Sequence, residues 1–259
     1  MNLGFFALKS QIVLMKFVFL LLVSLLSIAT LKSQESDIPM KSSVQDKDVL
    51  FGLQFAFPGD EMKKAVKNRM ANVGFGGTLY YLTNPLSWGK NKRNSAIRLG
   101  GELAYTYYGR FITDVTVGGY QGSYKTSYGI LNLNAIFRLR PPHVTPVVPF
   151  ADVIIGGNFY LSSMKDNLDA IESAFGVEAT NFGGYSSSSL NKGIGAGVSF
   201  GGTDPNKARF VVRVTCNWGS DIKYVVRNSV TYDPGSNSLH YEVGKAPVRY
   251  VLVQLGVGL

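Results

Sequence analysis

The chain alternates between bulky apolar residues and small or polar residues in eight separate stretches. This period of two is typical of β-strands, because successive side chains of a strand point to opposite faces. In the first stretch Phe51, Leu53 and Phe55 alternate with Gly52 and Gln54. We expect eight strands at about 49–57, 71–82, 96–108, 128–140, 147–161, 190–200, 208–218 and 248–259.

These predicted strands are long. Each covers about 9 to 15 residues, whereas a soluble strand averages about 5–6 and a membrane-spanning strand about 9–11. A series of such segments is the sequence signature of an outer-membrane barrel. The sequence therefore predicts an all-β fold, a closed antiparallel up-and-down transmembrane β-barrel of about eight strands.

The polar face of the predicted strands indicates which side meets the lipid. That face carries no Lys in any of the eight segments and is rich in Gly, Ala, Ser and Asn. Small residues suit the narrow interior of an eight-stranded barrel. We therefore expect the bulky apolar face to point outward into lipid. A soluble lipocalin-like barrel, with its apolar face inward, is the alternative.

The N-terminal region has the pattern of an export signal. Met15 and Lys16 precede an almost entirely apolar run over 17–29, and small residues follow. We predict a signal peptide over 1–33, with Met15 as an alternative start of translation, and a short periplasmic segment over 34–47 before the barrel at 48–259. A membrane anchor helix is the alternative, although the run is short for a bilayer span. Beyond residue 34 no long apolar run occurs, so a membrane location of the mature chain would require a closed barrel.

Composition narrows the function further. The net charge is +9, but Lys and Arg are scattered without a basic block, which argues against nucleic-acid binding. The single cysteine, Cys216, excludes an internal disulfide. No phosphate-binding loop, nucleophile elbow or metal-spaced histidine pair occurs, so we expect no cofactor and no metal.

One constellation could support catalysis. Ser238, His240 and Glu242 would share a face of an extended segment and could form the site of a lipid-modifying enzyme. Three polar residues on a loop hairpin are the simpler interpretation, and we predict that the chain is not an enzyme.

The predicted interior face carries seven charged residues: Arg98, Glu102, Arg138, Arg140, Asp152, Arg209 and Arg213. We interpret them as a salt-bridged network that fills the lumen, because buried charges must be paired. Five arginines face two acids, so water, carbonyl groups or phosphate must satisfy the rest. A narrow ion-selective pore is the alternative.

The connections are predicted to alternate in length. External loops are expected at about 58–70, 109–127, 162–189 and 219–247, and shorter turns at 83–95, 141–146 and 201–207. Segments 222–232 and 238–243 could extend their strands above the membrane and expose a β edge. The first loop, with a short helical turn, holds candidate contacts to lipopolysaccharide phosphates at Lys63, Lys64, Lys67 and Arg69. An ordinary solvated loop is the alternative.

Together, the signal, the eight segments, the Gly-x-Gly strands and the final Val253–Leu259 stretch resemble small bacterial outer-membrane barrels of the OmpA/OmpX type. The Ser33–Gln34 cut site resembles those common in Bacteroidetes. One departure is Leu259, where such barrels usually end in an aromatic residue. The resemblance implies an outer-membrane barrel with a structural or surface-interaction role, in contact with lipid and lipopolysaccharide and with an envelope partner at its long loops.

Overall fold

The structure is a computed structural model that describes residues 47–66, 73–88, 94–117, 120–142, 145–167, 185–201, 208–226, 229, 231–233 and 238–258. The predicted signal peptide and all but the last residue of the 34–47 segment lie outside the described residues. The elements are β1 (Lys47–Pro58), α2 (Asp60–Val66), β2 (Gly74–Thr83), the 3-10 helix η1 (Pro85–Ser87), β3 (Ile97–Val117), β4 (Tyr120–Leu139), β5 (Val147–Asn167), β6 (Tyr185–Phe200), β7 (Arg209–Val225), β8 (Thr231–Asp233), β9 (Ser238–His240) and β10 (Val243–Gly258).

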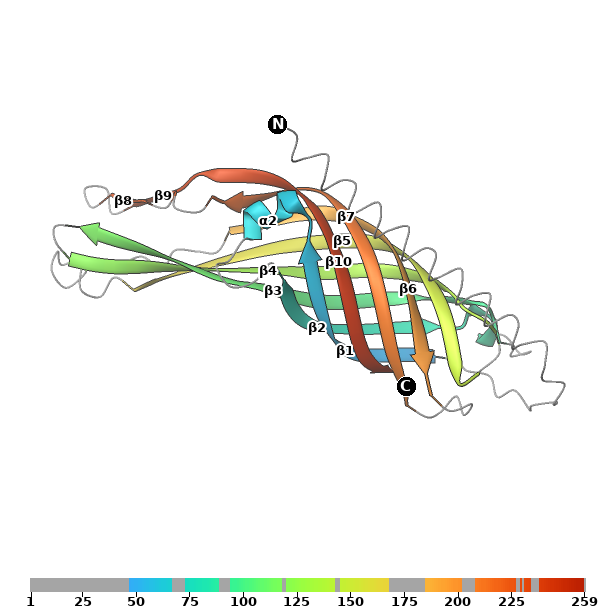
Figure 1. Cartoon of the computed structure of the whole chain (residues 1–259). Helices are drawn as coiled ribbons and strands as arrows, with labels where there is room; N and C mark the ends of the chain where they lie inside the picture. The colour runs from blue at the N-terminus through green and yellow to red at the C-terminus, as the bar shows by residue number, and fades with distance from the viewer. Residues whose placement is uncertain are drawn as a thin grey trace, which may run out of the picture.

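Eight of these strands form a closed antiparallel barrel in the order β1-β10-β7-β6-β5-β4-β3-β2 (Figure 1). Closure is made by β1, which pairs with β2 on one side and with β10 on the other. The remaining strands β8 and β9 form a separate two-stranded sheet. The predicted fold class is therefore confirmed.

The two ends of the barrel differ. We call the end where β1 begins and β10 ends the terminal end, and the opposite end, where α2 lies, the loop end. At the loop end the strands run well past the closed barrel, with the β3–β4 hairpin reaching far to one side (Figure 1).

The prediction of a loop over 109–127 is wrong, because the strands continue past the closed barrel. Those residues are strand, since β3 and β4 stay paired from Gly109 to Val117 and only 118–119 lies between them. Strands β5 and β6 likewise extend into the predicted loop over 162–189. The predicted extension of the strands around 219–247 is confirmed as far as Val225 and Val243, which pair with each other.

Inward and outward faces follow the predicted alternation. Along β1, Leu50, Gly52, Gln54 and Ala56 are buried, while the phenylalanines between them are exposed. Some inward positions accept no side chain, because the neighbouring strand is too close. A Cβ atom at Gly100 would collide with the carbonyl oxygen of Tyr81 on β2. Strong curvature in a narrow barrel thus explains this interior glycine.

A β-bulge marks the place where β3 leaves the closed barrel. The register between β3 and β4 shifts between Tyr107 and Gly109, and Gly109 has a φ of 99°. Glycine adopts this left-handed conformation without steric cost, and such bulges bend a strand. The bulge therefore redirects the hairpin as it passes the end of β2.

The helical segments are short. The predicted helical turn in the first loop is present as α2, whose first turn carries Asp60 and Glu61, as the helix dipole favours. Among the described residues, no helix has the length and apolar character needed to cross a bilayer.

Candidate functional site

Two arginines and two acids form the centre of the barrel interior. The Arg138 guanidinium donates to both carboxylate oxygens of Asp152, at 2.7 and 2.9 Å, and also to the Tyr80 hydroxyl at 2.8 Å. Arg213 donates from Nε to Asp152 at 2.7 Å and from a terminal nitrogen to Glu102. All four charged side chains are at most 4% exposed. Their charges balance, which buried ions require.

Amides and a hydroxyl complete the coordination of Glu102. One carboxylate oxygen accepts from Gln254 at 3.0 Å and from Thr78 at 3.2 Å, and the other accepts from Asn134 at 3.0 Å. Gln254 also donates to Gln54 at 3.1 Å, which links β10 to β1 across the closure of the barrel. These residues come from five strands, so the network ties the cross-section together.

The remaining predicted arginines lie at the terminal end. Arg140 donates to both carboxylate oxygens of Asp48 at 3.2 Å, and Arg98 Nε lies 3.7 Å from the same carboxylate. Arg209 donates to the Ser199 hydroxyl at 2.8 Å and to nearby backbone carbonyls. A small cavity lies beside this group and is lined by Asp48, Arg140, Ser199 and Arg209.

Toward the loop end the interior becomes amide-rich. The Tyr250 hydroxyl accepts from Asn132 at 2.7 Å and donates to Asn158 at 2.9 Å. Asn191 donates to Asn134 at 2.8 Å, which connects this layer to the charged centre. The side chains of Tyr250, Asn132, Asn158 and Asn191 are buried, and their bonds hold four strands together.

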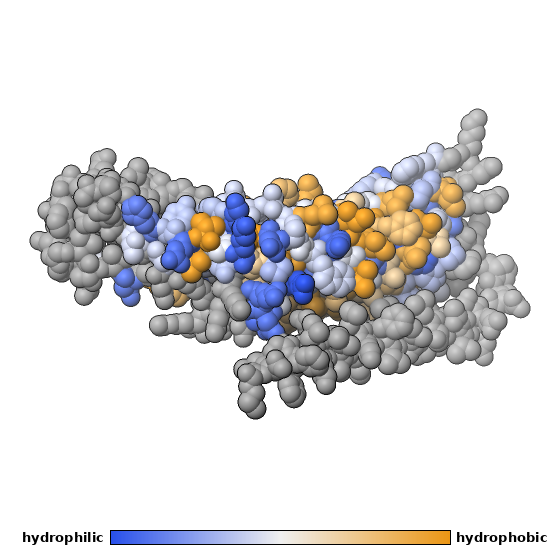
Figure 2. All heavy atoms as spheres, turned by 90° about the horizontal axis from the view of Figure 1, so that it is seen from above, coloured by the Kyte–Doolittle hydropathy of each residue, from blue (hydrophilic) through white to orange (hydrophobic). Residues whose placement is uncertain are grey.

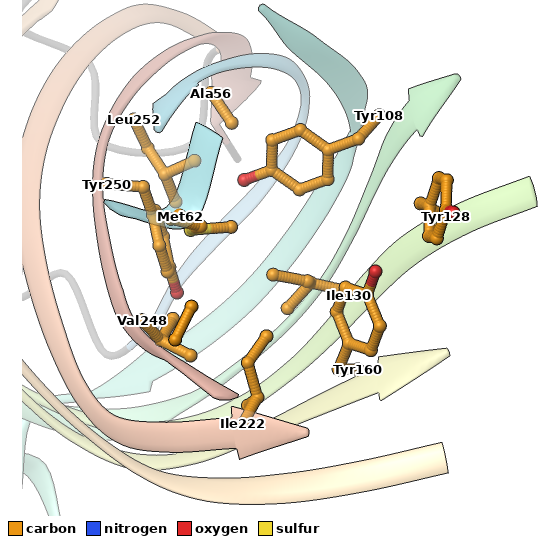
Figure 3. Close-up of a cluster of buried hydrophobic side chains, with 11 residues drawn as sticks. Ala56, Met62, Tyr108, Tyr128, Ile130, Tyr160, Ile222, Val248, Tyr250 and Leu252 are labelled. Atoms are coloured by element: carbon orange, nitrogen blue, oxygen red, sulfur yellow. The ribbon is translucent and has the colours of Figure 1, made fainter. Parts of the chain in front are cut away.

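An apolar cluster closes the loop end. Helix α2 contributes Met62, which is fully buried and points into the barrel among residues of six strands (Figure 3). The other buried members are Ala56, Tyr108, Tyr128, Ile130, Tyr160, Ile222, Ala246, Val248, Tyr250 and Leu252. A second cluster lies toward the terminal end and contains Leu50, Tyr80, Leu82, Ile136, Phe150 and Val211. Polar and apolar layers thus alternate along the interior.

The structure brings the seven predicted interior residues into two groups, the charged centre and the terminal end. The structure does not bring the four predicted lipopolysaccharide contacts of the first loop together in the same way. Lys63 forms an exposed ion pair with Asp60 at 3.0 Å, while the side chain of Lys64 and all of Lys67 and Arg69 lie outside the described residues.

The candidate catalytic set does not form a described site. His240 and Glu242 are exposed, and the side chain of Ser238 lies outside what the structure describes. Among the described residues, no group of three or more His, Cys, Asp or Glu could hold a metal ion.

Sequence reasoning missed several interior side chains. Asp48 precedes the first predicted strand at 49–57 and has no role in the prediction, although it is the acid that Arg98 and Arg140 meet. Tyr80 and Phe150 stack against the Arg138 guanidinium, whose central carbon lies 4.6 and 3.7 Å from their ring centroids. The signal for these rings was a break in alternation, because each lies in a run of consecutive apolar residues.

The outer wall has the opposite polarity. Large apolar side chains are exposed on all eight barrel strands, with Phe51 at 74% and Ile155 at 60%, while the charged centre formed by Glu102, Arg138, Asp152 and Arg213 is buried inside. A water-soluble barrel would bury the first set and expose the second. The chain is therefore a transmembrane β-barrel.

Known proteins have only distant similarity to this chain. No family model and no curated protein matches the sequence. Among solved structures, the chain is similar to Neisserial surface protein A, with 12% identity, a TM-score of 0.49 and coverage of 82% of this chain and 96% of that one. It is similar to OprG of Pseudomonas aeruginosa, with 15% identity, a TM-score of 0.43 and coverage of 84% and 96%. The attachment invasion locus protein of Yersinia pestis has 15% identity, a TM-score of 0.35 and coverage of 84% and 100%. At this level of similarity, the roles of those proteins do not transfer to this chain.

A projecting sheet is the second feature of the loop end. The last residue of β3 that pairs with β2 is Tyr107, yet β3 continues to Val117 beside β4. On the far side, β5 continues to Asn167 after its last pairing with β6 at Ser162. We call the part formed by 109–117, 120–127 and 163–167 the projecting sheet. In the described residues, both of its outer strands lack a further strand partner.

Proposed function

We propose that this barrel is a non-enzymatic surface-interaction protein, which binds another component of the cell envelope through its projecting sheet. The unpaired edges of that sheet carry the proposal. Its interior serves to hold the barrel rigid and does not conduct solutes.

The filled interior supports the structural part of this proposal. Interior side chains from the barrel strands bond to one another across the lumen, and Met62 of α2 packs into the apolar cluster at the loop end. An eight-stranded barrel has an interior just wide enough for such side chains. The charges at its centre have partners of opposite sign, which a permeating ion would have to displace.

The projecting sheet supports the interaction part. The paired hairpin from Gly109 to Val117 extends roughly 26 Å at about 3.3 Å per residue. An edge strand offers a row of backbone donors and acceptors to which an extended segment of another protein can add. Charged residues such as Arg110 and Asp114, both exposed, protect such an edge from uncontrolled aggregation and add selectivity.

The test is site-specific photo-crosslinking in intact cells. A photoreactive residue at Asp114 on the projecting sheet should give a discrete protein adduct, and one at Leu103, which is exposed on the outer wall, should not. Replacing 112–125 with Asn-Gly joins Phe111 to Thr126, which are already paired, and should leave a folded barrel without its hairpin. That shortened chain should lose the partner, detected through a crosslinker placed on β5.

Two results would replace this proposal with another. Steady single-channel conductance in planar bilayers that changes on substitution of Arg138 or Arg213 would favour a narrow pore. An altered lipid A or phospholipid profile in a deletion strain, restored by the native chain but not by an His240→Ala variant, would favour a lipid-modifying enzyme.

A further inference from the structure

The outer wall of β7 and β10 changes character at one level. The outward residues of β7 run Phe210, Val212, Val214, Cys216 and Trp218, and those of β10 run Val257, Leu255, Val253 and Val251 before Arg249. Trp218 and Arg249 pair directly across the two strands. Both apolar runs therefore end together, and this level is where the hydrocarbon core of the membrane ends on this side of the barrel.

Basic side chains follow at and beyond that level. Arg249 pairs with Trp218, which on its other side pairs with Lys192 of β6. Further toward the loop end, Lys223 and Lys245 pair with each other on the same outward face. All four cations are exposed. We call Lys192, Lys223, Lys245 and Arg249 the basic wall patch.

The described part of the chain neutralises this patch only in part. None of the four side chains has an ion-pair or hydrogen-bond partner among the described residues, and Asp221 is the acid on the same outward rows. The local charge is therefore +3, from four cations and one acid. Like charges directly opposite each other on adjacent strands are destabilising. The Lys223–Lys245 pair thus indicates that the native environment supplies an anion.

The position of the patch identifies the kind of anion. In Figure 2, which looks onto the upper face of Figure 1, strongly hydrophilic residues gather beside the orange apolar band on its loop-end side. Arg249 and Lys245 are four residues apart on β10, or about 13 Å along the strand. With a strand tilt of about 45° this spacing covers about 9 Å along the bilayer normal, so the two cations span the head-group layer, which is about 5–7 Å deep. Lys192 lies between exposed Leu190 and Ile194 and can extend its ammonium group toward the head groups.

The wall of β4 and β5 differs at the level of the border. Where these strands leave the apolar band, their next outward residues are Ser127 and Ser163, and a like-charge pair, Lys125 with Lys165, follows only one row further toward the loop end. The cations at the border itself, Lys192 and Arg249, therefore distinguish β6 and β10 from β4 and β5. We propose that the basic wall patch binds the phosphate groups of a phosphorylated membrane glycolipid, lipid A, in the leaflet at the loop end.

This site is separate from the projecting sheet, so the two proposals can fail independently. The experiment uses the full chain in a neutral non-ionic detergent, with Trp88→Phe so that fluorescence reports on Trp218, which pairs with Arg249 and Lys192 of the patch. The probes are lipid A, dephosphorylated lipid A and inorganic phosphate. The test variant is Lys223→Gln with Lys245→Gln. The control is Lys47→Gln, which removes an exposed cation at the terminal end, on the opposite side of the apolar band.

Lipid A should shift the Trp218 emission of the native chain and bind about 25-fold more weakly to the test variant, since each cation near an anionic membrane surface contributes roughly fivefold. The control variant should bind like the native chain. Equal affinity for dephosphorylated lipid A, or equal weakening in both variants, would overturn the proposal. If inorganic phosphate binds as tightly as lipid A, the patch recognises phosphate alone, and the conclusion that its ligand is a lipid is overturned. Loss of lipid A binding with an unchanged crosslink at Asp114 would support this site and leave the surface-interaction proposal intact.

Discussion

Two groups of basic side chains in this barrel differ in how their charge is compensated. In the interior, Arg138 and Arg213 share Asp152, and Arg213 also reaches Glu102, so charges balance within one layer. On the outer wall, Lys223 and Lys245 lie opposite each other, and no acid forms an ion pair with them in the described chain. A balanced buried group is explained by the fold itself, whereas an unbalanced exposed group at a membrane border points to something outside the chain.

The largest expected effect concerns the acid that both interior arginines share. Asp152→Ala would leave two buried guanidiniums with Glu102 alone, and removing one partner of a buried ion pair costs about 3–5 kcal/mol. We expect a loss of that size in the free energy of unfolding, measured by urea titration in lipid vesicles with tryptophan fluorescence. The exposed Asp114→Ala serves as control and should change the stability by less than about 0.5 kcal/mol. Equal effects of the two substitutions would show that the interior charges are not mutually dependent.

The apolar cap tests whether the loop end isolates this interior. Met62→Ala removes a fully buried side chain from the cluster that α2 shares with the barrel, and such truncations cost about 2–5 kcal/mol in cores. Because α2 takes no part in the strand pairing of the barrel, we expect the low end of that range, about 2 kcal/mol, in the hydrogen-exchange protection of the α2 amides. Lys63→Ala on the same helix breaks only an exposed ion pair and should cost at most about 0.5 kcal/mol. Unchanged protection in Met62→Ala would contradict a docked cap.

A single hydroxyl tests the amide layer. Tyr250→Phe deletes the group that bridges Asn132 and Asn158, leaving buried polar atoms without a partner. We expect about 1–2 kcal/mol of destabilisation in the same urea titration. Tyr105→Phe, on the outer wall and 43% exposed, is the matched control with little expected effect. A loss in the control that equals the loss in Tyr250→Phe would mean that the interior hydroxyl has no special role.

The sequence predicted the barrel because lipid on one side and a packed interior on the other impose a strict period of two. It predicted the inward placement of Arg138, Glu102 and Asp152, since charged residues at those positions face away from the apolar row. It could not assign their partners, because contacts such as Arg213 with Glu102 join residues that are 111 positions apart. Such contacts depend on the pairing register of every strand that lies between β3 and β7 around the barrel.

The loop end was harder to predict for a different reason. The apolar rows end at the border of the hydrocarbon, and a method that follows apolar alternation therefore ends the strands there. Strand pairing does not depend on lipid, so the β-branched and polar residues of 112–117 continue as strand beside β4. The same border explains why the basic wall patch was missed, because Lys223 and Lys245 fell within a predicted loop.

The smallest expected change in the free energy of unfolding is that of Lys245→Gln, and the direction of this change is what tests the lipid partner. In a neutral detergent, Lys245→Gln removes one of two like charges that face each other, so the free energy of unfolding should rise by about 0.2–1 kcal/mol. With lipid A present, the same substitution removes a phosphate contact, and the variant should become less stable than the native chain. Urea titrations under both conditions measure this reversal, and Lys47→Gln, which lies opposite Thr83 at the terminal end, is the control without one. If Lys245→Gln changes the free energy of unfolding in the same direction under both conditions, a lipid partner does not explain the outer patch.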